Sequence, residues 1–97
     1  MTALQKEQCA KIAQHYGEGP QLLILQEECA ELIQAASKIR RDTPGAYDNF
    51  IDELADVSIM IEEMKSFMDD DEETELMKRI NAKINRQLDR ITKEGLT

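Results

Sequence analysis

The sequence predicts an all-α fold of four helices, and three observations lead to this class. The chain is rich in Leu, Ile, Met and Ala, one third of its residues are charged, and only 4% are aromatic. It has no run of β-branched residues, the residue type that favours strands. Its longest stretches place apolar residues at steps of three and four, which is the spacing of a helix with one buried face.

The length of 97 residues corresponds to a single domain, spanning 1–97. A core of that size buries roughly 60% of the unfolded chain's surface, so we expect a second copy to cover part of the remaining apolar surface. The net charge of −8 argues against binding of nucleic-acid polymers, which needs clustered cations. No apolar run approaches the ~20 residues of a membrane span, and the first residues do not form a signal segment. We therefore expect a cytoplasmic protein with no membrane contact.

The first expected helix runs from about Thr2 to Tyr16 and is broken by Gly17-Glu18-Gly19-Pro20. Pro20 suits the first position of the second helix, because a helix start leaves its N–H groups unpaired in any case. Cys9 and Cys29 have no Cys or His close by in the sequence. We expect both to be reduced, partly buried thiols, outside any disulfide or metal site.

The second expected helix spans about Gln21 to Arg40. Its apolar stripe has helical spacing throughout and consists of Leu22, Leu25, Cys29, Leu32, Ile33, Ala36 and Ile39. Two arginines close it, where cations favour the negative end of the helix dipole. Thr43-Pro44-Gly45 forms the turn that follows, with Thr43 as the expected N-cap of the next helix.

The third expected helix spans about Ala46 to Met68, and the fourth about Glu72 to Lys93. The apolar stripe of the third is Phe50, Leu54, Val57, Ile61, Met64 and Met68. The fourth is expected to bury Leu76, Ile80, Ile84, Leu88 and Ile91. Asp69-Asp70-Asp71 ends the third helix and caps the fourth, where acids favour the positive N-terminus. Gly95 is expected to stop the fourth helix.

Two acidic pairs stand on the second and third helices, and they carry the main functional signal. They are Glu28-x-x-Glu31 and Glu53-x-x-Asp56. Residues three apart share one helix face, and the short loop should make the two helices antiparallel neighbours. All four acids lie at the margin of an apolar stripe, so packing should partly desolvate them. Four carboxylates from facing helices make a hard-oxygen site for Mg²⁺, with Mn²⁺ as the alternative ion.

A second interpretation of these pairs stays open on spacing alone. Because 20 of the 97 residues are acidic, such pairs arise by chance and usually form solvated surface. We expect that role for Glu63, which lies opposite the stripe of the third helix, and for its neighbour Glu62. Partly buried like charges, by contrast, are costly unless they are protonated or bridged by a cation.

The fourth helix carries a row of cations at steps of four, three and four: Arg79, Lys83, Arg86 and Arg90. Next to an acidic metal site, such a row suits the phosphates of a nucleotide–Mg²⁺ complex. The alternative is that these cations form surface ion pairs with the acids of residues 62–75, which are individually weak.

Glu28-Cys29-Ala30-Glu31, then 21 residues, then Glu53-Leu54-Ala55-Asp56 resembles the ExxE…ExxD motif of the MazG-like nucleoside triphosphate pyrophosphohydrolases. The stretch from His15-Tyr16-Gly17 through Glu31-Leu32 also resembles a compact branch of that family found in bacteria and their phages. The resemblance covers about residues 15–90. It implies an all-α chain whose four helices complete a helical bundle as a homodimer, or as a pair of dimers.

The resemblance also implies roles for individual residues. Glu28, Glu31, Glu53 and Asp56 would hold Mg²⁺, and a (d)NTP would be hydrolysed to the monophosphate and pyrophosphate. Glu27 or Glu28 would act as general base, and the sequence does not separate base from ligand. Lys83, Arg86 and Arg90 are the best matches for phosphate contacts, although the Lys/Asn/Arg spacing of better-defined members is not reproduced.

Other functions remain open at this stage. Within the same superfamily, two rival activities stay open: that of a phosphoribosyl-ATP pyrophosphohydrolase and that of a dUTP- or dCTP-specific enzyme. A di-iron bundle is nearly excluded, because it needs an E-x-x-H on each of two helices and His15 is the only histidine. From a different class, a non-catalytic acidic helical interaction or regulatory module could keep the same fold.

Overall fold

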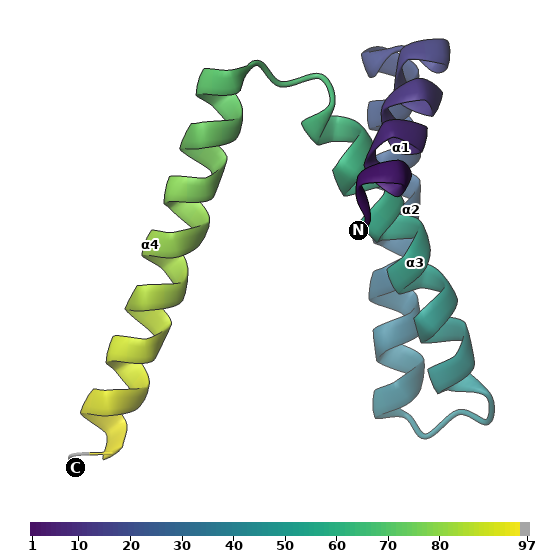
Figure 1. Cartoon of the computed structure of the whole chain (residues 1–97). Coiled ribbons are helices and arrows are strands. Elements are labelled where there is room, and N and C mark those ends of the chain that lie inside the picture. The colour runs from purple at the N-terminus through teal and green to yellow at the C-terminus, as the bar shows by residue number, and fades with distance from the viewer. Residues whose placement is uncertain (96–97) are drawn as a thin grey trace. The chain divides into compact units, whose positions relative to one another are not determined.

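The computed structural model describes residues 1–95, which form four α-helices and no strand. The helices are α1 (Ala3–Tyr16), α2 (Glu18–Arg40), α3 (Ala46–Lys65) and α4 (Asp70–Gly95). The prediction of an all-α, four-helix chain is therefore confirmed. The chain divides into two compact units, Met1–Phe67 with α1 to α3 and Met68–Thr97 with α4, and each is described by itself (Figure 1).

Helix α1 begins with a capping box. The Gln5 backbone N–H donates to Thr2 Oγ1 at 3.1 Å, and the Thr2 N–H donates back to Gln5 Oε1 at 2.9 Å. Gly17 ends the helix with a φ of 92° and is also the N-cap of α2. The second helix thus begins at Glu18, earlier than predicted, and Pro20 is its third residue and not its first. This position still lies in the first turn, where the missing N–H costs nothing.

A tight turn joins α2 to α3. Asp42 has a φ of 55° and Gly45 a φ of 75°, so the chain reverses through two left-handed residues. Gly45 is the N-cap of α3, with no side-chain hydrogen bond, and the prediction that Thr43 caps this helix is wrong. Thr43 instead accepts a bond from the Ala46 N–H through its backbone oxygen, at 3.1 Å. A glycine suits this position because it adopts a left-handed conformation without strain.

The core of the first unit lies where α1, α2 and α3 meet. Figure 1 shows α2 and α3 side by side and antiparallel, with α1 against them. The buried apolar residues are small or flexible: Cys9, Ala13, Ala35, Ala46, Val57 and Met60. Cys9 and Cys29 are free thiols, the first buried and the second half-buried, as predicted.

The predicted stripes are only partly buried. On α2, Leu22 is 43% exposed and Ile33 70%, and on α3, Leu54 is 42% exposed and Ile61 51%. The physical reason is that apolar residues cover two faces of each helix, and the contact between α2 and α3 buries only one. The third helix also ends at Lys65, before the predicted Met68.

The prediction that Glu63 is a solvated surface acid is wrong. Its side chain is 2% exposed, and its Oε1 accepts a hydrogen bond from Gln21 Nε2 at 2.6 Å. Its neighbour Glu62 is half-buried and forms an ion pair with Lys65 at 3.5 Å. The buried face of α3 runs through Val57 and Met60, and Glu63 continues it one turn further on.

Helix α4 begins with a second capping box, in which Asp69 has the predicted capping role and Glu72, which was expected only to begin the helix, is its partner. The Glu72 N–H donates to Asp69 Oδ1 at 2.8 Å, and the Asp69 N–H donates to Glu72 Oε1 at 3.2 Å. Asp70 is already helical, and Gly95 is the last helical residue. Within residues 1–95, no helix is both long enough and apolar enough to cross a membrane.

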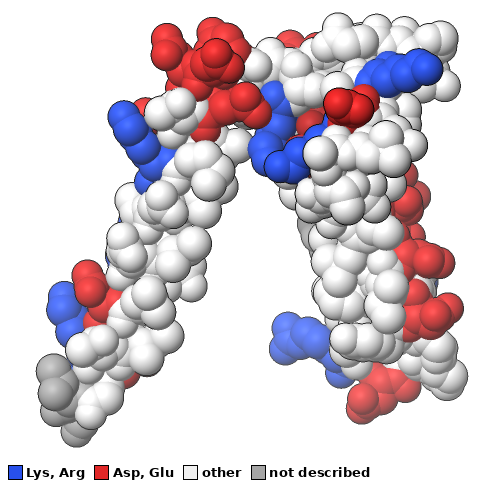
Figure 2. Space-filling model, viewed as in Figure 1, with Lys and Arg blue, Asp and Glu red and all other residues white. Residues whose placement is uncertain are grey.

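The prediction that α4 buries its apolar stripe is wrong for the chain by itself. No residue of α4 is buried. Leu76 is half-buried, whereas Ile80, Ile84, Leu88 and Ile91 are between 38% and 64% exposed. A helix that alone forms its unit has no facing element against which to pack such a stripe. Figure 2 shows a broad uncharged surface on one side of α4 and a group of acids at its start.

Candidate metal centre

Three of the predicted acids come together between α2 and α3. Glu28 of α2 and Glu53 and Asp56 of α3 each offer a carboxylate oxygen, and these oxygens lie within 4.8 Å of one another. We call these three residues the acidic cluster. The antiparallel packing of the two helices brings the first pair of acids opposite the second, as the spacing predicted.

Two oxygen atoms of the cluster are buried without a partner. Glu28 Oε2 and Glu53 Oε2 are shielded from solvent, and within residues 1–95 nothing donates a hydrogen bond to either. Both residues are half-buried, whereas Asp56 is exposed and keeps the cluster open to solvent on one side. A buried, unpaired carboxylate oxygen costs free energy, and a proton or a cation removes that cost.

The electrostatics of Glu28 reflect this crowding. Burial raises the pKa of its carboxyl above the ordinary 4.5, and the charges of Asp56, Glu31 and Glu53 raise it further, in that order. A hydrogen bond that the protonated acid can share with Asp56 acts in the same direction. All of these causes disfavour the ionised form of Glu28 in the absence of a positive charge.

Glu53 behaves in the same way. Burial is again the largest cause of its raised pKa, followed by the charge of Glu31 and a hydrogen bond that the two acids can share. Asp56 and Asp52 contribute smaller repulsions. The ionised forms of Glu28 and Glu53 are therefore both disfavoured, and a divalent cation between them would offset their mutual repulsion by attracting each carboxylate.

Glu31 and Glu27 lie less centrally than the sequence alone predicted. Glu31 is exposed and outside the group of oxygens within 4.8 Å, although its charge acts on both Glu28 and Glu53. Glu27 is exposed as well. It precedes Glu28 by one residue, which is about 100° around the helix, so the two side chains point in different directions.

The predicted phosphate ligands lie on α4, in the second unit. Lys83 and Arg86 line a shallow pocket together with Arg79 and Ala82, and Arg90 is exposed one turn further on. Arg79 forms an ion pair with Glu75 at 3.0 Å, so one member of the cationic row has the surface role that was the alternative. The acidic cluster and the predicted phosphate ligands thus belong to different units.

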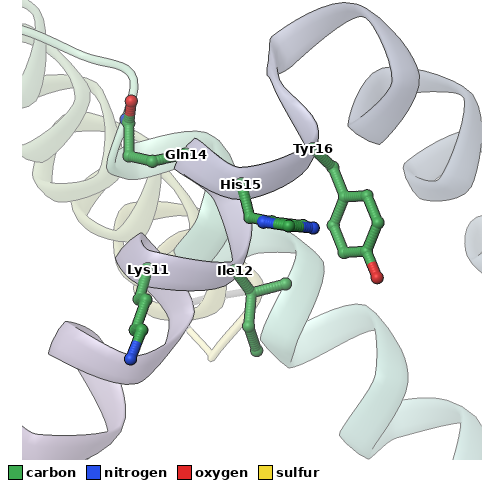
Figure 3. Close-up of a pocket in the computed structure, with 5 residues that line it drawn as sticks. All are labelled: Lys11, Ile12, Gln14, His15 and Tyr16. Carbon is green, nitrogen blue, oxygen red and sulfur yellow. The ribbon is translucent and has the colours of Figure 1, made fainter.

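A different pocket lies near the end of α1. Figure 3 shows the residues that line it, Lys11, Ile12, Gln14, His15 and Tyr16, all of which are exposed. The His15 and Tyr16 rings meet edge to face with centroids 4.7 Å apart. No carboxylate is among the residues that line this pocket, and its histidine packs against the Tyr16 ring.

One buried polar contact between α2 and α3, the hydrogen bond between Gln21 and Glu63, was not predicted from the sequence. A signal was present: Gln21 precedes Glu28 by seven residues, and Glu63 follows Asp56 by seven. Seven residues are two helical turns, so each partner shares a face with an acid of the cluster.

Comparisons with protein families, curated proteins and solved structures give no match for this chain. The acidic cluster and the motif to which its residues belong are therefore the observations that bear on function.

Proposed function

We propose that this protein is a Mg²⁺-dependent nucleoside triphosphate pyrophosphohydrolase of the MazG-like type, which converts a (d)NTP to the (d)NMP and pyrophosphate. The observation that carries this proposal is the acidic cluster, with two buried carboxylate oxygens that lack any partner within residues 1–95. The order of the acids along the chain, which resembles the ExxE…ExxD motif of MazG-like enzymes, is the reason for proposing a nucleoside triphosphate as the substrate.

The residues of the cluster fit a hard divalent cation. Glu28, Glu53 and Asp56 would hold Mg²⁺ or Mn²⁺, with Glu31 as the fourth acid at the rim. Oxygen-only donor sets of this kind favour these ions over zinc. When bound, the ion offsets the charge on the phosphate oxygens and the leaving pyrophosphate.

The remaining chemistry belongs to the side chains. A water molecule attacks the phosphorus that carries the nucleoside, and the bond from that phosphorus to the pyrophosphate oxygen breaks. Glu27 or Glu28 accepts the proton of the water. Lys83, Arg86 and Arg90 would bind the phosphate oxygens through charge-assisted hydrogen bonds.

The uncovered apolar surfaces support a homodimer, or a dimer of dimers, as the active form. Leu54 and Ile61 on α3 and Ile84 and Leu88 on α4 are each at least 42% exposed. Exposed apolar residues that recur along one face of a helix, as they do on each of these two helices, mark an interaction site. A second copy that covers these faces would complete the helical bundle and would bring cations of α4 close to an acidic cluster.

One feature favours a second candidate, a non-catalytic interaction or regulatory module. The apolar stripe of α4 is flanked by cations, which suits a protein partner as well as it suits a second copy. Under this alternative, the protein would release no pyrophosphate, and Mg²⁺ would change its stability little.

The experiment that separates the two candidates is an assay of pyrophosphate release from canonical and damaged (d)NTPs, dUTP, dCTP and phosphoribosyl-ATP. Each is assayed with Mg²⁺, with Mn²⁺ and with a chelator. Metal-dependent release supports the hydrolase, and the preferred nucleotide identifies the substrate. A folded protein that releases nothing from any of them contradicts the proposal.

A further inference from the structure

The hydrogen bond between Gln21 and Glu63 is a buried polar contact that joins the start of α2 to the end of α3. Gln21 is 7% exposed and Glu63 2%, and the Nε2–Oε1 distance is 2.6 Å. Glu63 is also the largest fully buried side chain of the described chain. It lies near α1 as well, since its charge contributes, after burial, to the raised pKa of Cys9.

The position of this pair is tied to the acidic cluster by simple helix geometry. In two antiparallel helices, the residue numbers of facing positions rise along one helix as they fall along the other. Seven residues after Gln21 stands Glu28, and seven residues before Glu63 stands Asp56. Three residues further in the same sense stand Glu31 and Glu53. Pairing Gln21 with Glu63 therefore places Glu28 opposite Asp56 and Glu31 opposite Glu53.

The electrostatics agree with this pairing. Among the acids that raise the pKa of Glu28, Asp56 has the largest charge effect, and for Glu53 that acid is Glu31. Each carboxylate thus faces another carboxylate, and repulsion opposes this alignment of α2 and α3. The buried apolar residues of α2 and α3 are few, namely Ala35, Ala46, Val57 and Met60, and two of them are alanines, whose small side chains set the alignment of two helices only weakly.

We propose that the Gln21–Glu63 hydrogen bond fixes the register of α2 against α3 and so holds the acids of the cluster face to face. A slip of the helices would leave the Glu63 carboxylate buried without its donor, which is far more costly than the loss of an apolar contact. Buried polar pairs set helix register in other helical assemblies in this way. Gln21 and Glu63 are thus positioning residues, and their link to metal binding rests on the proposed function.

The test compares three variants. Gln21→Leu removes the donor, and Met60→Ala removes buried apolar contact from the same interface without touching a polar group. The double variant Gln21→Glu/Glu63→Gln exchanges the two side chains and can restore the hydrogen bond in the opposite sense. Mn²⁺ affinity is measured by electron paramagnetic resonance, and stability by urea unfolding.

Register is measured separately, as the distance between spin labels on exposed positions of α2 and α3. Labels at Gln26 and Asp48 serve this purpose, in chains whose Cys9 and Cys29 are replaced by alanine and which are diluted with unlabelled protein. A slip by one helical turn moves the labels by about 5 Å.

We expect Gln21→Leu to shift or broaden the label distance and to weaken Mn²⁺ binding at least tenfold. The exchanged pair should restore the original label distance and return the Mn²⁺ affinity to within about threefold of its original value. Met60→Ala should lower stability while leaving the label distance and the Mn²⁺ affinity unchanged. An unaltered label distance in Gln21→Leu, or an exchanged pair that restores nothing, would overturn the proposal. If the original protein binds no Mn²⁺, the metal site fails, and the label distance alone still decides the register.

Discussion

At the scale of single residues, Glu53 is the most informative position in the molecule. Its carboxyl is half-buried, one oxygen has no hydrogen-bond partner, and three other acids act on its charge. An ionised side chain in that position destabilises the fold unless a proton or a cation neutralises its charge. Its replacement should therefore separate the metal site from the stability of the helices.

We expect Glu53→Gln to lower kcat/KM for (d)NTP hydrolysis roughly 10²–10³-fold, the range for losing one transition-state stabilising group. The same change should raise the melting temperature of the metal-free protein, because it removes a repelling charge. Turnover and thermal unfolding are measured in parallel, with chelator present in the unfolding experiment.

The matched control is Asp48→Asn, which removes one exposed acid from the first turn of the same helix. It should leave turnover within about twofold, as surface substitutions usually do. Unchanged turnover in Glu53→Gln would rule out the assignment of Glu53 to the site.

The raised pKa values of Glu28 and Glu53 also predict how stability depends on pH. Because each carboxyl holds its proton more tightly in the folded state, the folded protein binds more protons than the unfolded one. Stability then falls as pH rises from the ordinary pKa of 4.5 through the raised values. We expect the urea midpoint of the metal-free protein to fall over this range, and saturating Mg²⁺ to remove the fall.

The chain has 20 acidic residues in all, so the decisive comparison is with Glu53→Gln. That variant should show a smaller pH-dependent loss of stability than the original protein. An identical pH profile in the two proteins would contradict the account of the cluster.

At the scale of helices, the capping boxes decide where α1 and α4 begin. Asp69 accepts the Glu72 N–H at 2.8 Å, and no core residue helps to hold the first turn of α4. We expect Asp69→Ala to destabilise this turn by about 1 kcal/mol. Faster amide hydrogen exchange at residues 71–73, with unchanged exchange in α2, is the result that checks it. Equal exchange before and after the substitution would show that the cap contributes little.

The helices also show what could be predicted from sequence and what could not. Gly17 and the Asp69 cap are local signals, so the helix order and most of the ends were predictable. The facing of Glu28 and Glu53 followed from two spacings and a short loop. The burial of Glu63 could not be predicted from such spacings, because the apolar residues of α3 cover two faces. Leu54 and Ile61 outline one face, and Val57 and Met60 the other. Sequence periodicity does not say which face packs within the chain.

At the scale of the whole molecule, the exposed apolar faces of α3 and α4 are the basis for proposing a homodimer. An exposed position on an isolated helix tolerates a polar residue at a cost within about 0.5 kcal/mol. The same substitution in the core of a dimer costs about 2–5 kcal/mol. Ile84, which is 52% exposed in the single chain, distinguishes the two cases.

We expect Ile84→Gln to weaken a dimer by at least about 30-fold, which corresponds to about 2 kcal/mol. The measurement is molar mass by light scattering over a range of protein concentrations. Ala82→Gln is the matched control, since it adds the same side chain on the opposite side of α4. A monomeric original protein, or equal effects of the two substitutions, would contradict the dimer.

The central claim is that Glu28, Glu53 and Asp56 form a divalent-cation site between α2 and α3. A Mn²⁺ titration, followed by electron paramagnetic resonance, tests it most directly for the original protein, Glu53→Gln and Asp48→Asn. We predict saturable binding by the original protein and by Asp48→Asn, competition by Mg²⁺, and at least a tenfold loss of affinity in Glu53→Gln. Equal Mn²⁺ affinity in all three proteins would contradict the claim.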